Sequence, residues 1–405
     1  DFLKTHNILR QQQFGFQKDK SCSLQLLNCT NSWIGCLDQK KSVDVVYIDF
    51  QKAFDTVVHS KLLHKLEAIL PNRFLKGWIR SFLSGRSQVV TLNGTLSEPI
   101  PVSSGVPQGS VLGPTLFLIY INDLVDIIKH SKITLFADDL KIYNTSDQQQ
   151  LLQSDLDSLS SWATEWQLSI SHSKSNVLYL GKNNPKHHYF LGLHPLDDIG
   201  VSCKDLGVYI SNNLGSSIQC KNIVSKASRV SALVLRSFVS KDRNLLIRAF
   251  KTYVRPLLEY ATVVWSPHLI CDINSVENVQ RRFTKRVLAG SHFSYDDRLR
   301  ILKLDRLELR RIHFDAIMAY NIIKRNVLSW EEFYSLSGYC KTRSHEKEVI
   351  SIEKFRLDIK KFGFKTRSAY FWNVIPSEVK NAGSLNSFKK GILEVDFSRF
   401  LKGRT

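Results

Sequence analysis

The sequence has one methionine, no cysteine pair in C-x-x-C spacing and no long apolar run. The missing pairs argue against a zinc ribbon or a thioredoxin-type redox motif. Cys22, Cys29 and Cys36 recur every seven residues, a pattern typical of a buried helix stripe rather than a metal site. The seven cysteines are an odd number, so we expect free thiols and a reducing, intracellular compartment.

No apolar stretch approaches the ~18 residues that a membrane span needs, and no signal-peptide pattern is present. We therefore expect no membrane partner. The chain begins with Asp1 instead of Met, which predicts that further sequence lies upstream.

Acidic residues are outnumbered, since 56 Lys and Arg face 37 Asp and Glu, which gives a net charge of +19. A surplus of this size is usually compensated by a polyanionic partner such as nucleic acid. The hydrophobic fraction of 43% is that of an ordinary globular protein. Charge therefore restricts the partner without naming the activity.

Hydrophobic periodicity predicts an α+β sheet domain with helices on one face, followed after about residue 212 by mostly helical, basic sequence. An apolar helix over 110–128 should bend at Gly113-Pro114, and Asn93-Gly94 should form a hairpin turn between strands 89–92 and 100–102. The other expected helices are 21–37, 60–70 and 155–166, and the other expected strands are 43–50, 133–136, 140–143, 176–180 and 203–210.

A basic stripe follows the helical pattern near residue 280. Its apolar face carries Val276, Val279, Phe283 and Val287, and its other face carries Arg281, Arg282, Lys285 and Arg286. Such a face is either simply solvated or lies along a phosphate backbone, and the net charge of the chain favours the second interpretation.

Carboxylates end two of the expected strands. Asp49 closes VVYID, and Asp138 and Asp139 lie at the tip of LFADDLKIY. Aspartates are common in hairpin turns for local reasons, so a lone pair would indicate little. Three carboxylates at strand ends, however, suit Mg²⁺, which prefers oxygen ligands and promotes phosphoryl transfer.

A glycine-rich loop separates these sites. Gly105 and Gly109 permit close backbone approach, Pro107 stiffens the loop, and Gln108 offers a donor and an acceptor at the start of a helix. Alone, this loop would be an ordinary turn.

Together the three segments resemble the palm of a reverse transcriptase, in the order YIDFQKAFD (47–55), SGVPQGSVLGP (104–114) and FADD (136–139). They are most similar to the jockey and chicken-repeat-like groups of non-LTR (LINE-type) retrotransposons. QFGFQKDKSC (13–22) resembles a fingers-side motif of that group, and similarity continues into the carboxy-terminal region. Group II intron maturases share the palm motifs, but the carboxy-terminal similarity argues against them.

The resemblance implies a right-hand polymerase. Residues 1–210 would form the reverse transcriptase domain, 211–330 a helical thumb-like region and 331–405 a basic extension. Within the first, 1–42 and 71–102 would be partial fingers, and 43–70 and 103–210 the palm.

The resemblance also assigns roles. Asp49 and Asp138, with Asp139 close by, would hold two Mg²⁺ ions, for which Mn²⁺ could substitute, and Lys174 would protonate pyrophosphate. The Phe50 backbone would line the triphosphate, and Gly105 and Gln108 would contact the template–primer and the nucleotide. Phe54 would either exclude a ribose 2′-hydroxyl or be a core residue beside Ala53. Asp55 would either act in chemistry or begin a helix.

The fingers motif departs from the family pattern, because Gln17 and Lys20 stand where arginines are usual. Lys18 and Lys20 are the expected phosphate-binding cations there. The implied activity is target-primed DNA synthesis from an RNA template, a DNA 3′-hydroxyl and dNTPs, with a nuclear step and an endonuclease domain missing from this chain. The alternative is an inactive or repurposed nucleic-acid-binding remnant.

Overall fold

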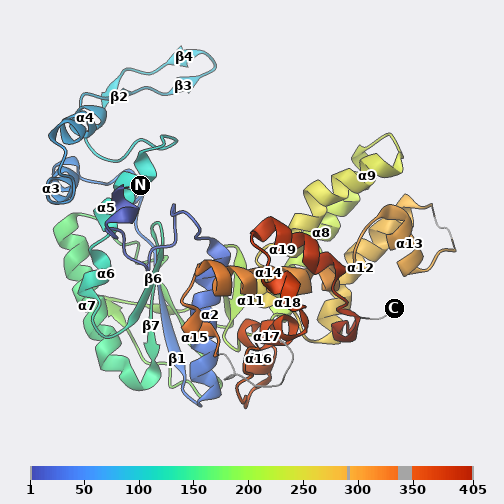
Figure 1. The fold of residues 1–405 in the computed structure, drawn as a ribbon. Coiled ribbons are helices and arrows are strands. Elements are labelled where there is room, and N and C mark those ends of the chain that lie inside the picture. The colour runs from blue at the N-terminus through green and yellow to red at the C-terminus, as the bar shows by residue number, and fades with distance from the viewer. Residues whose placement is uncertain (1, 290–291, 336–348, 404–405) are drawn as a thin grey trace. The chain divides into compact units, whose positions relative to one another are not determined.

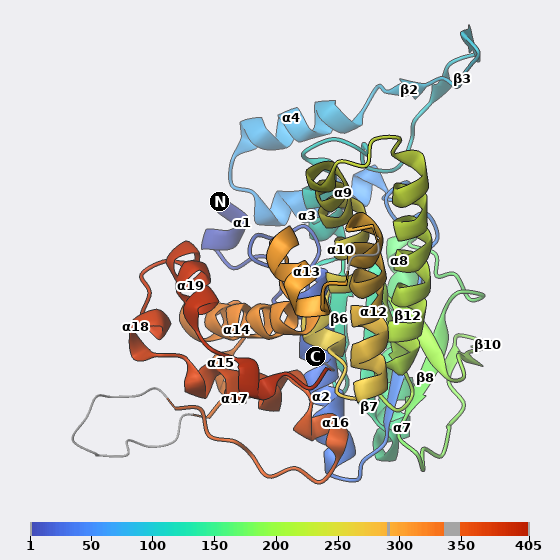
Figure 2. The same cartoon turned by 90° about the vertical axis from the view of Figure 1, so that its right-hand side faces the viewer.

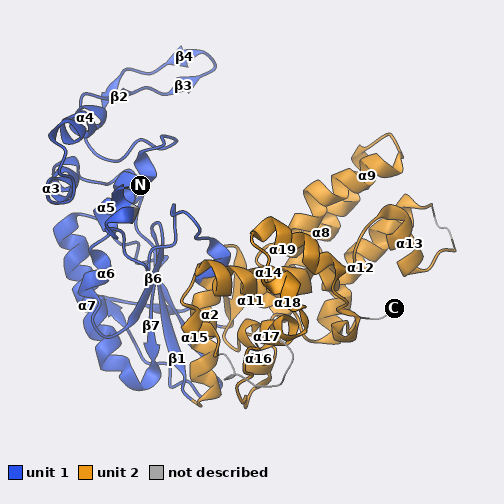
Figure 3. Cartoon of the chain, in the orientation of Figure 1, with its two compact units in different colours: residues 1–25, 41–200 blue, residues 26–40, 201–405 orange. Residues whose placement is uncertain are grey.

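The computed structural model describes residues 2–289, 292–335 and 349–403. The chain divides into two compact units (Figure 3): unit 1 comprises residues 1–25 and 41–200, and unit 2 comprises residues 26–40 and 201–405. Helix α2 (Cys22–Asp38) contributes its first residues to unit 1 and the rest to unit 2. Cys340 and part of the expected carboxy-terminal extension lie outside the described residues.

Unit 1 is built on a five-stranded sheet with the order β11-β8-β1-β7-β6. Figure 1 labels three of its strands, β1, β7 and β6. Central strand β1 pairs antiparallel with both β7 and β8, which explains why its β-branched run VDVVYI is almost wholly buried. The strands are β1 (Val43–Ile48), β6 (Lys132–Phe136), β7 (Asp139–Thr145), β8 (Asn176–Leu180) and β11 (Asp197–Asp198). These positions confirm the strands expected at 43–50, 133–136, 140–143 and 176–180.

Helices cover the sheet face that carries Val46 and Ile48, and the core between them includes Leu66, Phe117 and Leu159. The helices are α1 (Phe2–Thr5), α3 (His59–Ile69), α4 (Arg73–Leu83), α5 (Gly113–Ile121), α6 (Leu124–Ile127) and α7 (Gln149–Trp166), with the 3₁₀ turn η1 (Ser146–Gln148). Small two-stranded pairs complete the unit: β2 (Ser87–Gln88) with β5 (Ile100–Pro101), β3 (Thr91–Leu92) with β4 (Thr95–Leu96), and β9 (Phe190–Leu191) with β10 (His194–Pro195).

Three expectations need correction in unit 1. Gly113-Pro114 does not bend a helix but begins one, because proline suits the first turn, where its missing N–H is not needed. The interruption comes at 122–123 instead. The turn at Asn93-Gly94 is confirmed, yet the strand near 100 pairs with Ser87–Gln88. Finally, α7 begins at Gln149, before the expected residue 155.

Unit 2 is mostly helical, as expected. Figure 2 shows α8 and α12 side by side, and a second core gathers around α14 and α17. Its helices are α8 (Ser217–Ser237), α9 (Arg243–Ala249), α10 (Arg255–Glu259), α11 (Thr262–Trp265), α12 (Ile270–Val287), α13 (Tyr295–Leu302), α14 (Leu307–Arg325), α15 (Trp330–Phe333), α16 (Asp358–Lys361), α17 (Phe364–Val374), α18 (Ser377–Lys380) and α19 (Leu385–Gly391), with the π-helical η2 (Phe250–Val254) and the 3₁₀ turns η3 (Ile392–Glu394) and η4 (Ser398–Phe400). None of the helices in the described residues has the length and apolar character to cross a bilayer.

The strand expected over 203–210 is a hairpin. β12 (Ser202–Asp205) turns at Leu206-Gly207, where both residues have positive φ, and returns as β13 (Val208–Ser211). The apolar face of α12 is confirmed, since Val276, Val279, Phe283 and Val287 are all buried.

Candidate active site at the ends of β1 and the β6–β7 hairpin

The sheet brings two distant aspartates to one end of adjacent strands. β1 ends at Ile48, which pairs with Leu140 of β7, so Asp49 follows at the same end as the β6–β7 turn. That turn is a two-residue loop, Ala137-Asp138, closed by the pair Phe136 and Asp139. Ala137 has a φ of +56°, a conformation that side-chain-bearing residues seldom adopt.

The electrostatics of this corner reflect two nearby negative charges. Burial raises the pKa of the Asp138 carboxyl, and the charge of Asp49 raises it further. Oδ2 of Asp49 is buried and accepts no hydrogen bond within the described chain. The ammonium of Lys174 lies 3.4 Å from that oxygen, and its side chain is 71% exposed. A buried carboxylate oxygen without a donor and a second carboxylate that repels it form a corner that favours a cation.

These features fit a magnesium ion in part. Mg²⁺ is usually held by one or two carboxylates together with substrate phosphates and water, and Asp49 and Asp138 can supply those carboxylates. The described residues contain no group of three or more His, Cys, Asp or Glu side chains placed as a metal site. Asp139, the first residue of β7, is exposed, so its role as a third ligand stays a prediction.

Phe54 lies on the border between core and site. Its ring stacks on buried Phe117 at 4.2 Å between centroids and meets exposed Phe16 edge-on at 6.1 Å. The side chain is half-buried, so both roles expected for it, core packing and contact with a substrate, remain open. Phe50 is buried and its backbone forms a bridge with Ile170.

The loop from Ser104 packs against Asp55. Gly105 has a φ of +83°, and a Cβ there would lie 2.8 Å from the Cα and the carbonyl oxygen of Asp55. The Gln108 amide donates a hydrogen bond of 2.7 Å to the Asp55 carboxylate. Asp55 does not begin a helix, because α3 starts at His59 with Val58 as its N-cap. Asp55 instead holds the glycine-rich loop through this hydrogen bond, a contact that the sequence alone did not indicate.

The expected phosphate-binding cations differ in their surroundings. Lys18 is exposed, whereas the Lys20 ammonium donates to the carbonyl oxygens of Gln11 and Gln13 and lies 4.7 Å from the ring centre of Phe14. Burial lowers the pKa of Lys20 to about 8. Lys20 therefore stabilises its own loop.

On α12 in unit 2, Arg282, Lys285 and Arg286 are exposed, and Arg281 stacks over Tyr295 at 4.2 Å.

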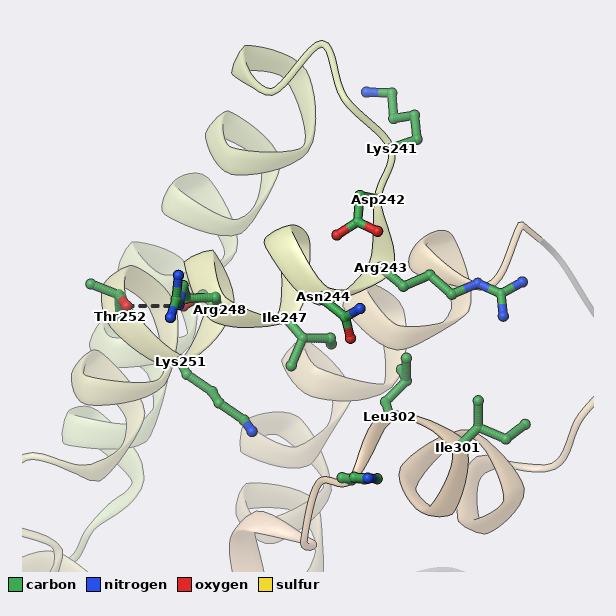
Figure 4. Close-up of a pocket in the computed structure, with 11 residues that line it drawn as sticks. Lys241, Asp242, Arg243, Asn244, Ile247, Arg248, Lys251, Thr252, Ile301 and Leu302 are labelled. Atoms are coloured by element: carbon green, nitrogen blue, oxygen red, sulfur yellow. Dashed lines mark hydrogen bonds between the residues drawn. The ribbon is translucent and has the colours of Figure 1, made fainter.

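Unit 2 also contains an open cavity of about 700 Å³ that the sequence did not reveal (Figure 4). The charged residues of its lining are five cations and one acid: Lys241, Arg243, Arg248, Lys251, Lys303 and Asp242.

Comparison with known proteins agrees with the resemblance of the motifs. The family described as reverse transcriptase (RNA-dependent DNA polymerase) matches residues 1–202, about half of the chain. The probable RNA-directed DNA polymerase from transposon X-element of Drosophila melanogaster is 28% identical over 72% of this chain and 33% of its own length. The RNA-directed DNA polymerase from mobile element jockey of Drosophila funebris is 28% identical over 68% of this chain and 31% of its own length.

Among solved structures, telomerase from Candida albicans shares 12% identity with a TM-score of 0.39, covering 83% of this chain and 56% of that chain. The present chain spans about a third of the length of the two transposon relatives. Both the matched family and these relatives agree with the three palm-like motifs. The chain belongs to the reverse transcriptase family, in the group carried by non-LTR retrotransposons.

Proposed function

We propose that this chain extends a DNA 3′-hydroxyl on an RNA template, using dNTPs, as the polymerase of target-primed reverse transcription. The observation that carries the proposal is the corner where Asp49, Asp138 and Lys174 gather. Binding nucleic acid does not require two mutually repelling carboxylates at one corner, whereas nucleotidyl transfer uses them. Because the primer of this group is nicked chromosomal DNA, a nuclear step is part of the proposal.

The reaction joins the primer 3′-oxygen to the α-phosphorus of a dNTP and breaks the bond to pyrophosphate. Two Mg²⁺ ions held by Asp49 and Asp138, with Asp139 as a third carboxylate, would stabilise charge on the attacking and leaving oxygens. The 3′-hydroxyl proton passes to solvent, and the Lys174 ammonium gives a proton to the departing pyrophosphate. The exposed Lys174 side chain has the freedom to reach that group.

Substrate selection would rest on the neighbouring loops. The Phe50 backbone would line the triphosphate, and Phe54 would exclude a ribose 2′-hydroxyl. The Gly105 and Gln108 loop, fixed by Asp55, would face the template–primer and incoming nucleotide.

Unit 2 would hold the nucleic acid. The exposed cations of α12 and the basic cavity between α9 and α13 can each neutralise phosphates (Figure 4). In the cavity, Asp242 is the N-cap of α9, where its side chain accepts from the Leu245 N–H. One carboxylate against five cations leaves the lining strongly positive. With Lys18, these groups would bind RNA template and DNA primer.

In polymerase terms we assign partial fingers to residues 1–42 and 71–102 and the palm to 43–70 and 103–210. Residues 211–330 would be the thumb and 331–405 a basic extension. The palm assignment rests on the β1–β7–β6 sheet, and the thumb assignment on the helices from α8 onward.

A second candidate function is nucleic-acid binding without catalysis. The basic cavity and the α12 face favour it specifically, because both would operate without the carboxylates. The two candidate functions differ in one requirement: the polymerase needs the Asp138 carboxylate, whereas nucleic-acid binding alone does not.

Primer extension on poly(rA)–oligo(dT) with Mg²⁺ separates them. We expect extension by the wild type and by Asp157→Asn, an exposed aspartate on α7, but loss of extension in Asp138→Asn. A folded wild type that binds the template–primer and never extends it would establish the binding function instead.

A further inference from the structure

The turn that carries Asp138 is held by one buried side chain. Gln13, only 4% exposed, lies against the Ala137 peptide. Its Oε1 accepts a hydrogen bond of 2.9 Å from the Ala137 N–H, and its Nε2 donates one of 3.2 Å to the Ala137 carbonyl. Both backbone polar groups of the strained residue are thus satisfied by the same amide.

The amide of Gln13 is itself held in place. Its Oε1 also accepts from the Gly15 N–H at 2.8 Å, so the side chain cannot rotate without losing a second bond. The flanking backbone pairs with β6, since Phe14 N–H donates to the Leu135 carbonyl at 2.7 Å and Leu135 N–H donates to the Gln12 carbonyl at 2.9 Å. The Gln13 carbonyl accepts from Gln17 and Lys20.

Gly15 makes this close approach sterically feasible. A Cβ at residue 15 would lie 2.3 Å from the Ala137 nitrogen, which no real structure tolerates. The Q-x-G spacing therefore has a physical reason. The glycine lets the loop approach the turn, and the glutamine two residues earlier bonds to both the N–H and the carbonyl of Ala137. Only Gln and Asn side chains carry both an amide donor and an amide acceptor, and Gln has the greater reach.

We infer that Gln13 is a positioning residue for catalysis: by clamping the Ala137 peptide in its left-handed conformation, it aims the Asp138 carboxylate toward Asp49. Asp138 follows Ala137 directly, so the orientation of that peptide determines the direction of the Asp138 side chain. This inference rests on the proposed polymerase function for its role in turnover, although the clamp itself does not.

The test compares Gln13→Leu, which removes all three side-chain hydrogen bonds at similar volume, with Gln13→Glu, which keeps the acceptor and loses the donor. The matched control is Gln12→Leu, at the exposed neighbouring glutamine. For each variant, kcat, the KM for dTTP and the half-saturating Mg²⁺ concentration are measured on poly(rA)–oligo(dT), with the thermal midpoint as a check on folding.

We expect Gln13→Leu to lower kcat by about 100-fold, the effect of misplacing a reacting group by about 1 Å, and to raise the Mg²⁺ requirement. Gln13→Glu should lower kcat at least as much as Gln13→Leu, because its carboxylate would face the Ala137 carbonyl to which the amide donates. Gln12→Leu should match the wild type. Affinity for the template–primer should change less than twofold, because the Gln13 amide is buried and bonds only to the backbone of its own loop and of the turn. Adding Ala137→Gly to Gln13→Leu should recover part of kcat, since glycine adopts positive φ without strain.

A readout apart from activity keeps the two proposals distinguishable. Mn²⁺ titration followed by electron paramagnetic resonance should show weaker binding in Gln13→Leu than in wild type. If wild type binds Mn²⁺, loses that binding on Gln13→Leu and yet never extends a primer, the clamp stands and the polymerase proposal fails. Unchanged kcat, Mg²⁺ requirement and Mn²⁺ affinity in folded Gln13→Leu would overturn the positioning role.

Discussion

The ammonium of Lys174 lies 3.4 Å from Oδ2 of Asp49, an oxygen that is otherwise buried without a hydrogen-bond donor. The pair joins a proposed metal ligand to a proposed proton donor. A cation that occupies the Asp49 oxygen would release the lysine toward solvent, where the departing pyrophosphate leaves. The ion pair is therefore a resting arrangement, and the lysine should act only after substrate binds.

If Lys174 is the acid, Lys174→Met should lower kcat by roughly 100-fold, the usual contribution of a positioned proton donor, with little effect on the KM for dNTP. Lys182→Met, at an exposed lysine of unit 1, is the matched control and should retain the wild-type kcat. A Lys174→Met enzyme with wild-type kcat would show that this lysine is not the proton donor.

Asp138→Asn should stabilise the protein in EDTA at neutral pH. The pKa of Asp138 is raised by burial and by the charge of Asp49, so the native state binds this proton more tightly than the unfolded chain does. Its charged form therefore costs stability above the folded pKa, and protonation removes that cost as the pH falls. The gain in free energy of unfolding should be larger at pH 7.5 than at pH 4.5 by urea denaturation. Asp157→Asn controls for loss of one charge, and an equal gain there would refute the local explanation.

Gly105→Ala should destabilise unit 1 more than Gly109→Ala does. Both glycines have positive φ, at +83° and +80°, so both substitutions introduce backbone strain. Only the Cβ at residue 105 would collide with the Asp55 backbone, whereas residue 109 faces open space. We expect an additional loss of about 2 kcal/mol at residue 105, measured by denaturant unfolding. Equal losses would mean that the loop shifts away from Asp55 freely.

Phe54→Val tests whether the aromatic ring selects the sugar. If the ring excludes the 2′-hydroxyl, the preference for dTTP over UTP should fall by roughly tenfold or more in primer extension. If the ring only packs on Phe117, the variant should lose stability with no change in that preference.

The basic features of unit 2 should govern the salt dependence of nucleic-acid binding. Replacing Arg282, Lys285 and Arg286 with Gln should reduce the slope of log K against log salt by about 1 for each phosphate that is no longer neutralised. The same test applies to Arg243, Arg248 and Lys251 in the cavity. Lys389→Gln with Lys390→Gln, exposed on α19, is the control for net charge, and it removes two charges instead of three. An equal effect per charge removed would indicate attraction by overall charge without a local site.

Much of the sheet could be predicted because two sequence signals indicate its strands: runs of β-branched residues, and the residues that end those runs. Asp49 and Asp138 fall at strand ends in the sequence pattern, and antiparallel pairing then brings them to one corner. Gly113-Pro114 misled the prediction because proline is compatible with both a kink and a helix start, and local sequence does not distinguish them. The hairpin at Leu206-Gly207 was missed because Leu206, the first residue of its turn, adopts a positive φ that leucine seldom takes, so the sequence carries no usual turn signal there.

The role of Gln13 was not predictable from its surroundings in the chain. A glutamine at the end of a polar run is expected to be exposed, and the partner of Gln13, Ala137, lies far away in sequence. The basic cavity was hidden in the same way, because α9 and α13 each look like ordinary amphipathic helices until they are packed together.

The short segment at Gln12–Phe14 has a consequence beyond the turn it supports. β6 is the last strand of the sheet, and this segment pairs with part of its outer edge. An uncovered strand edge is a template for another chain. Proteolysis near residue 20 would keep every aspartate of the corner in the chain, but it would remove Gln13 and expose that edge. The trimmed protein should therefore self-associate through strand addition, and its solubility should report whether the amino-terminal segment is docked.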